Sequence, residues 1–199
     1  VTKQVVYVRN PDENVTFFRF AVFGDNRPSD NVMPQPESFR ILKDEVNIIR
    51  PRFAILVGDV IYGYRSDITR LKMQWAGFME IYNDFKIPVF VAPGNHEIKT
   101  EDVRTSGDPV AEALYVTNLG RLYYSFAYGN SYFIILDTDL VGHASYIEGE
   151  QLDWLIERLK EAQNYTHTFV FMHKPVVTSP GSDGLNNDYE ISKLLIYYN

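Results

Sequence analysis

The chain has 199 residues, of which 45% are hydrophobic, 23% charged and 15% aromatic, a composition typical of one globular domain with a sizeable core. Its net charge of −7 argues against the basic surface that nucleic acids and anionic membranes attract. The absence of cysteine excludes disulfides, thiolate zinc sites and a cysteine nucleophile. No apolar run approaches the roughly 20 residues that span a membrane, so we expect no membrane segment.

The cellular compartment stays open, with an inclination towards an extracytoplasmic one. Asn14-Val-Thr16 and Asn164-Tyr-Thr166 match the glycosylation sequon, although such triplets often arise by chance. The absence of cysteine fits a reducing or an oxidising compartment equally well. No pattern indicates the oligomeric state.

In the first half of the chain, short apolar runs alternate with residues at helical spacing. We expect strands over residues 17–23, 53–57 and 89–92, and helices over residues 39–49 and 71–82. Pro51 ends the first helix. The run 53–57 is continuously apolar, which is typical of a strand buried on both faces. The βαβαβ order implies a parallel sheet with helices on its faces.

The second half begins with residues 98–120, which show little pattern and are expected to form a loop. Two strand-like runs then flank Gly129-Asn130-Ser131 and predict a hairpin. We expect the hairpin strands over residues 124–128 and 132–136, a helix over 152–159, a strand over 169–172 and a helix over 191–198. The last helical pattern runs to the end of the chain without a cap, so we expect the fold to be cut short at its C-terminus.

Polar side chains follow four of the predicted strands. Asp25, Asp59, Asn95 with His96, and His173 each lie one to four residues beyond a strand end. The carboxyl ends of parallel strands meet at one edge of a sheet, where ligands bind. We therefore expect these side chains to converge, although they are far apart in the sequence.

The chemistry of these groups is matched as well. Carboxylate, amide oxygen and imidazole are ligands of hard-to-borderline divalent metals, and one central carboxylate can bridge two cations about 3.5–4 Å apart. Taken singly, each group also has a plainer interpretation. A Gly-Asp pair is a common turn or helix cap, Gly94 to Glu97 could be a turn with a helix-starting glutamate, and His173 could be a packed core histidine. The set is much more specific than its members.

The set also matches a family. Gly58-Asp59-Val60-Ile61-Tyr62, Gly94-Asn95-His96-Glu97 and Phe171-Met172-His173 resemble signature blocks of the calcineurin-like metallophosphoesterase superfamily in order and spacing, and Gly24-Asp25 stands where its first block belongs. Segments 123–137 and 150–155 are similar to its hairpin and helix. The resemblance implies an α/β fold, with a β-sandwich core of mixed, largely parallel sheets flanked by helices. It further implies a single catalytic domain over residues 1–199 that lacks its C-terminal part.

The resemblance also implies roles for individual residues around two metal ions, of iron, manganese or zinc. Asp25 would bind the first ion, Asp59 would bridge both, and Asn95 and His173 would bind the second. His96 would reach the substrate phosphate and either protonate the leaving oxygen or stabilise the transition state. A hydroxide held between the ions would attack phosphorus in line.

The first block departs from the pattern of many members, which have Asp-x-His where this chain has Asp25-Asn26-Arg27. Purple acid phosphatases also lack that histidine and use the tyrosine of Gly-Asp-x-x-Tyr, which is Tyr62 here, so the chain resembles that branch. Tyr62 is then expected to be a metal ligand, with a packing tyrosine as the alternative. Arg27 stays protonated and cannot ligate, but it could bind a phosphate oxygen bidentately.

The last block of the family, Gly-His-x-His, supplies one histidine to each ion and does not occur in this chain. Either it lies beyond Asn199 or the protein has lost it, and each ion would be one ligand short. The favoured function is hydrolysis of small phosphomonoesters or phosphodiesters. The alternative is a degenerate, catalytically weak or inactive binding module. A Rossmann-like nucleotide binder comes last, because no Gly-x-Gly-x-x-Gly or Walker loop is present. We expect loops 98–120 and 176–188 to set the substrate.

Overall fold

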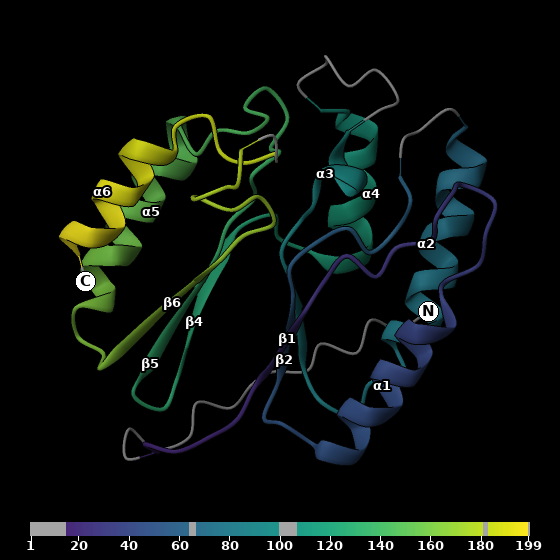
Figure 1. Cartoon of the computed structure of the whole chain (residues 1–199), viewed down its shortest axis with the longest axis horizontal. Coiled ribbons are helices and arrows are strands. Elements are labelled where there is room, and N and C mark those ends of the chain that lie inside the picture. The colour runs from purple at the N-terminus through teal and green to yellow at the C-terminus, as the bar shows by residue number, and fades with distance from the viewer. Residues whose placement is uncertain (1–14, 64–66, 100–106, 181–182, 199) are drawn as a thin grey trace.

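Two three-stranded sheets lie face to face between two layers of helices in the computed structural model (Figure 1). The structure describes residues 15–63, 67–99, 107–180 and 183–198, and Asn14 of the first sequon lies outside them. The expected α/β class with mixed, largely parallel sheets is confirmed. Within these ranges, no helix combines the length and apolar character that crossing a membrane requires.

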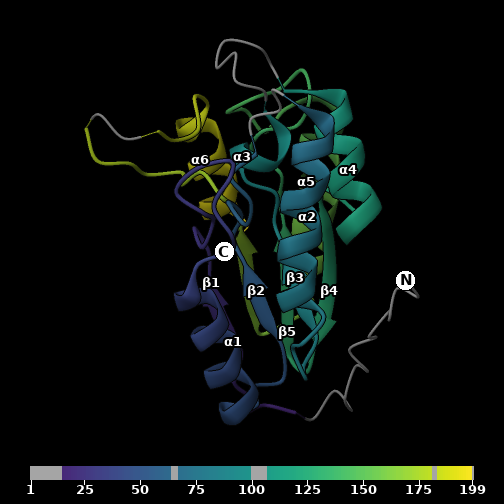
Figure 2. The same cartoon turned by 90° about the vertical axis from the view of Figure 1, so that its right-hand side faces the viewer.

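The first sheet is parallel, in the order β1-β2-β3, which confirms the expected βαβαβ unit. Helices α1 and α2 form the connections and cover its outer face (Figure 2). The elements are β1 (Ala21–Phe23), α1 (Glu37–Ile49), β2 (Ala54–Leu56), α2 (Ile68–Tyr82) and β3 (Val89–Val91). Helix α1 ends at Arg50, a left-handed C-cap with φ of 50° directly before Pro51.

The second sheet has the order β4-β5-β6 and contains the predicted hairpin. Strand β6 pairs in parallel with β5, and α5 and α6 pack on the outer face of this sheet (Figure 1). The elements are β4 (Tyr124–Tyr128), β5 (Ser131–Ile135), α5 (Gly149–Ala162), β6 (His167–Phe171) and α6 (Asp188–Tyr197).

Strand alternation explains the layers, because successive side chains point to opposite faces of a sheet. On β2, Ile55 packs between the sheets while Leu56 packs against the helices. On β5, Phe133 packs between the sheets while Ile134 packs against α5 and α6. Strand β2 is therefore buried on both faces, as its continuous apolar run predicts.

Two sequence predictions differ from the structure. The strand expected over residues 17–23 is confined to Ala21–Phe23, because Phe18 and Phe20 join the cluster between the sheets upstream of the paired residues. The loop expected over residues 98–120 is wrong over α4 (Pro109–Leu119), which Asp108 caps by accepting from the Val110 N–H at 2.9 Å. The apolar residues of α4 do not form one stripe, so helical spacing gives no clear signal.

Glu97 joins the loop after β2 to the loop after β3. It lies at the third position of the short helix α3 (Asn95–Ile98), and its fully buried carboxylate accepts four backbone N–H bonds. The donors and distances are Asp59 at 2.9 Å, Val60 at 2.9 Å, Ile61 at 3.1 Å and Gly94 at 2.8 Å. Burial raises the pKa of Glu97 to about 7, and the charge of Asp59 adds to this, while the backbone N–H groups oppose it.

The two loops are close enough to require glycine at both positions. A Cβ on Gly94 would lie 2.4 Å from the Asp59 nitrogen, and one on Gly58 would lie 2.6 Å from the Gly94 Cα. Gly58 also has a φ of 86°, in the left-handed region. This contact between the loops places Asp59 next to Asn95 and His96.

We predict that Glu97→Gln lowers the free energy of unfolding by about 2–4 kcal/mol, because the amide nitrogen faces backbone donors in place of a carboxylate oxygen. Urea denaturation at pH 8, where the carboxylate is ionised, measures the change. The matched control is Glu45→Gln on the exposed face of α1, which should stay within about 0.5 kcal/mol of the wild type. Equal stability of the two variants would contradict the role of Glu97.

Candidate metal centre

The two aspartates that follow β1 and β2 have the same unusual backbone conformation. Asp25 and Asp59 both have φ of 53°, which non-glycine residues rarely adopt. The Asp25 N–H donates to the Gly58 carbonyl at 3.0 Å, which holds the two loops side by side. Asp25 is exposed, whereas Asp59 is buried.

Three of the predicted ligands come together. One ligand atom each from Asp25, Asp59 and His173 lies within 4.8 Å of the other two. His173 Nε2 is 3.3 Å from Asp59 Oδ1 and 3.1 Å from Asn95 Oδ1, so Asn95 adjoins the same group. The residues come from the ends of β1, β2 and β6 and from the start of α3, as the sequence pattern predicts.

The second nitrogen of His173 fixes its orientation. Nδ1 lies 2.8 Å from the Val57 carbonyl oxygen, which can only accept, so Nδ1 carries the proton in this bond. The Nε2 lone pair of a neutral imidazole then faces Asp59 and Asn95. An imidazole held through its other nitrogen by a backbone carbonyl is typical of metal-binding histidines.

The other oxygen of Asp59, Oδ2, faces Arg27 and His96, which are not among the predicted metal ligands. Asp59 Oδ2 lies 3.2 Å from Arg27 Nε and 3.6 Å from His96 Nε2. His96 Nδ1 bonds to the Tyr62 carbonyl oxygen. Burial lowers the pKa of His96, while the charge of Asp59 and the Tyr62 carbonyl oppose this effect.

Tyr62, predicted as a further ligand, lies in the same region. Its ring centroid is 5.8 Å from the guanidinium carbon of Arg27 and 5.8 Å from the ring centroid of His96. The structure thus gathers all seven predicted site residues, namely Asp25, Arg27, Tyr62, Asp59, Asn95, His96 and His173. The individual roles of these residues stay predictions.

The donor set fits a hard-to-borderline cation, because it offers carboxylate and amide oxygens and an imidazole nitrogen. The Asn26 amide, between Asp25 and Arg27, has both its oxygen and its nitrogen buried without a hydrogen-bond partner among the described residues. Buried polar atoms rarely lack a hydrogen-bond partner in folded proteins. An orphaned amide and two strained aspartates in one loop region are features that a bound ligand would explain better than packing does.

Sequence reasoning missed an ion-paired group beside His173. Asp139 has no exposed surface, and its Oδ1 lies 2.6 Å from Lys174 Nζ and 3.0 Å from Lys99 Nζ. Lys174 follows His173, and Lys99 follows α3. The network therefore ties the loop after β5 to two segments that carry predicted ligands. The available signal was the position of Asp139 shortly after a strand, the criterion that selected Asp25 and Asp59.

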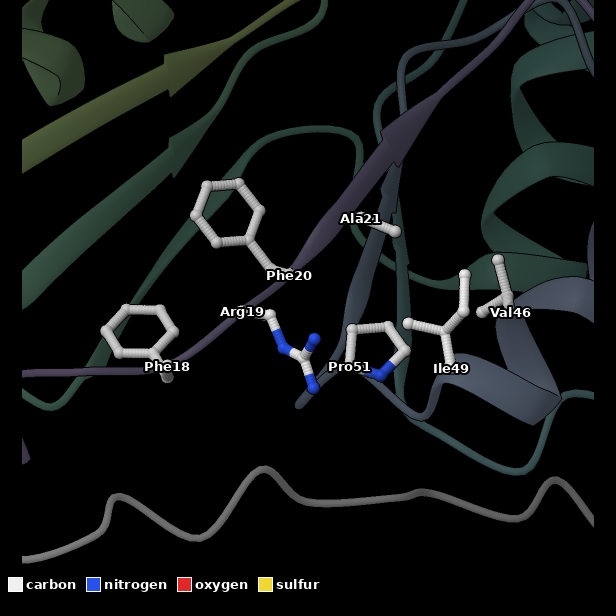
Figure 3. A pocket seen from close by; sticks show the side chains of 7 residues that line it. All are labelled: Phe18, Arg19, Phe20, Ala21, Val46, Ile49 and Pro51. Atoms are coloured by element: carbon white, nitrogen blue, oxygen red, sulfur yellow. The ribbon is translucent and has the colours of Figure 1, made fainter.

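A separate hollow of about 420 Å³ lies beside the start of β1 (Figure 3), whereas Asp25 follows the other end of that strand. Its lining is apolar except for Arg19, with Phe18, Phe20, Val46 and Ile49 among the side chains (Figure 3). It has no group that could bind a metal or transfer a proton. This hollow is therefore not a candidate for the chemistry expected at the carboxyl ends of the strands.

Solved structures with a similar fold include two phosphatases and an anchor protein. A purple acid phosphatase from yellow lupin (Lupinus luteus) seeds has a TM-score of 0.60 and 17% identity, over 80% of this chain and 31% of its own. A dimetal phosphatase from Danio rerio has a TM-score of 0.67 and 15% identity, and the match covers 88% of this chain and 76% of that protein. GAP50, the anchor in the inner membrane complex of Plasmodium, has a TM-score of 0.58 and 18% identity, and the match covers 91% of this chain and 62% of that protein.

The chain thus spans about a third of the lupin enzyme, and at these identities the likeness concerns the fold. Comparison with curated protein sequences gives no significant match. The profile of the calcineurin-like phosphoesterases, in contrast, matches residues 18–199, nearly the whole chain. With its fold and the purple acid phosphatase among its structural neighbours, this match shows that the chain belongs to the calcineurin-like phosphoesterase family.

Proposed function

We propose that this domain hydrolyses phosphate esters of small substrates in a metal-dependent reaction. The observation that carries the proposal is the convergence of Asp25, Asp59 and His173 ligand atoms within 4.8 Å of one another, with Asn95 adjoining them. The family and its phosphatase neighbours support the same reaction class. The hydrolysis of monoesters, of diesters or of both is consistent with this site.

We expect two ions, of iron, manganese or zinc. Asp25 and Tyr62 would hold one ion, Asn95 and His173 would hold the other, and Asp59 would be shared. When bound, such ions activate water and stabilise negative charge on the phosphate. A tyrosinate ligand would favour ferric iron at the first position.

Arg27 and His96 are the side chains proposed to bind the phosphate and to protonate the leaving oxygen. The Arg27 guanidinium is half-buried beside Asp59 and keeps its charge, so it can bind a phosphate oxygen. His96 has Nδ1 fixed by the Tyr62 carbonyl, and its Nε2, which lies 3.6 Å from Asp59 Oδ2, would be the atom that meets the substrate. A protonated Nε2 can donate to the leaving oxygen. Burial lowers the pKa of His96 and works against that form, while the nearby charge of Asp59 works for it.

A second candidate function is a binding module without turnover. It is supported by the fold likeness to GAP50, an anchor in the inner membrane complex of Plasmodium, and by the absence of a Gly-His-x-His block from residues 1–199. Turnover of any phosphate ester that depends on Asp59 would decide for the enzyme.

We predict that Mn²⁺ at about 100 times its dissociation constant raises the melting temperature by about 5–10 °C, because a ligand that binds only the folded state adds about 2.7 kcal/mol. Elemental analysis after removal of excess metal should find two ions per chain, and Asp59→Asn should lose both effects. Asp153→Asn, an exposed carboxylate of α5, is the matched control. An unchanged metal content in Asp59→Asn would refute the proposed ligand set.

We further predict that His96→Ala lowers kcat by about 10²–10⁴-fold and retains the metal content of the wild type, because His96 is proposed to transfer a proton. Steady-state hydrolysis and elemental analysis of the same preparation separate the two effects. His167→Ala, on the exposed start of β6, should leave both unchanged. Loss of metal in His96→Ala would mean that His96 is a ligand.

A further inference from the structure

A groove leads away from the candidate metal centre along the segment between β1 and α1. In Figure 1 this segment crosses to α2 before α1 begins. A hollow of about 390 Å³ has Asp25 and Arg27 in its wall, and a second hollow of about 430 Å³ adjoins it. The two share Pro28, Met33 and Pro34. We call these shared residues, together with Asp25, Arg27 and Met73, the Met33 groove.

The Met33 groove is charged at one end and mostly apolar along its length. Asp25 and Arg27 are its charged end, which belongs to the candidate metal centre. Met33 is 51% exposed and Met73 on α2 is 69% exposed, so both thioether side chains are open to a ligand. Each hollow has the volume of a small-molecule site, and methionine adapts its shape to apolar groups of different outline.

The wall of the groove is preformed by hydrogen bonds within its own segment and to the loop after β2. Asp30 Oδ1 accepts from the N–H groups of Val32 at 2.8 Å and Met33 at 2.9 Å. The buried Gln35 donates its amide to the Val60 carbonyl at 2.8 Å, which ties the segment to the loop that carries Asp59. Pro28 and Pro34 fix φ on this wall. A ligand would thus bind without ordering the segment first.

We infer that the Met33 groove binds the leaving group of the substrate, and that this leaving group is an apolar alkyl or aryl alcohol several carbon atoms long. The inference rests on the proposed function, since it places the phosphate at the Asp25 and Arg27 end. From there the groove offers Pro28, Pro34 and the two methionines to the rest of the ester. The polar side chains that also line the second hollow are already hydrogen-bonded, Gln35 to the Val60 carbonyl, Gln74 to the Gly63 N–H and Arg70 to Asn31. A sugar or another polyhydroxyl leaving group would therefore lose water there for few new polar partners.

The test compares esters whose alcohols have similar acidity, so that only the length of the alkyl chain differs. Wild-type enzyme assayed with Mn²⁺ should hydrolyse n-hexyl phosphate with a kcat/KM at least tenfold above that for methyl phosphate. In the double variant Met33→Asn, Met73→Asn this ratio should fall to near one. Ile48→Asn, which changes an 80% exposed side chain on α1, is the matched control and should keep the wild-type ratio.

A binding measurement separates failure of the groove from failure of the proposed function. n-Hexylphosphonate, which cannot be hydrolysed at its P–C bond, should raise the melting temperature more than methylphosphonate in the wild type but not in the double variant. Equal kcat/KM for both esters, or a ratio that is unchanged in the double variant, would refute the assignment of the Met33 groove to the leaving group. Tighter binding of n-hexylphosphonate without hydrolysis of either ester would support the groove and refute the proposed function.

Discussion

The buried carboxylate of Glu97 is the interaction on which the site depends. It accepts backbone N–H groups from both the Asp59 loop and Gly94, so one side chain sets the separation of two ligand-bearing loops. A buried charge is tolerated only when it is well hydrogen-bonded, and four donors meet that requirement. A change in either loop would remove donors from Glu97 and destabilise the other loop.

The same contact explains why the sequence has glycine before Asp59 and before Asn95. The loops approach so closely that a Cβ on Gly58 would also lie 2.9 Å from His173 Nδ1. Steric exclusion thus acts on three segments at once, namely the ends of β2, β3 and β6. These glycines therefore permit the close approach of the backbones, and at Gly58 also a left-handed turn conformation.

Much of this arrangement could be predicted from the sequence, because the strong signals were local. The continuous apolar run of β2 and the helical spacing of α1 gave the correct element types. Polar residues at strand ends gave five of the candidate site residues, and the family resemblance added Arg27 and Tyr62. The failures concern information that is not local. Helix α4 is apolar around its circumference and so lacks the periodicity of a surface helix. The partners of Glu97 are 36 to 38 residues away in the Asp59 loop, and no spacing rule pairs them.

The costs concentrated at this edge of the sheet favour a ligand-binding role over a purely structural one. Asp25 and Asp59 both have a left-handed backbone, which costs on the order of 1 kcal/mol each relative to glycine. Glycine at either position would relieve the strain while keeping the Asp25 and Asp59 N–H bonds that hold the loops together. The Asp59 carboxylate also has a backbone role, because its Oδ1 accepts the buried His96 N–H at 3.2 Å. The exposed Asp25 carboxylate on a left-handed backbone, beside the orphaned Asn26 amide, is better explained by a ligand that needs an oxygen donor in that place.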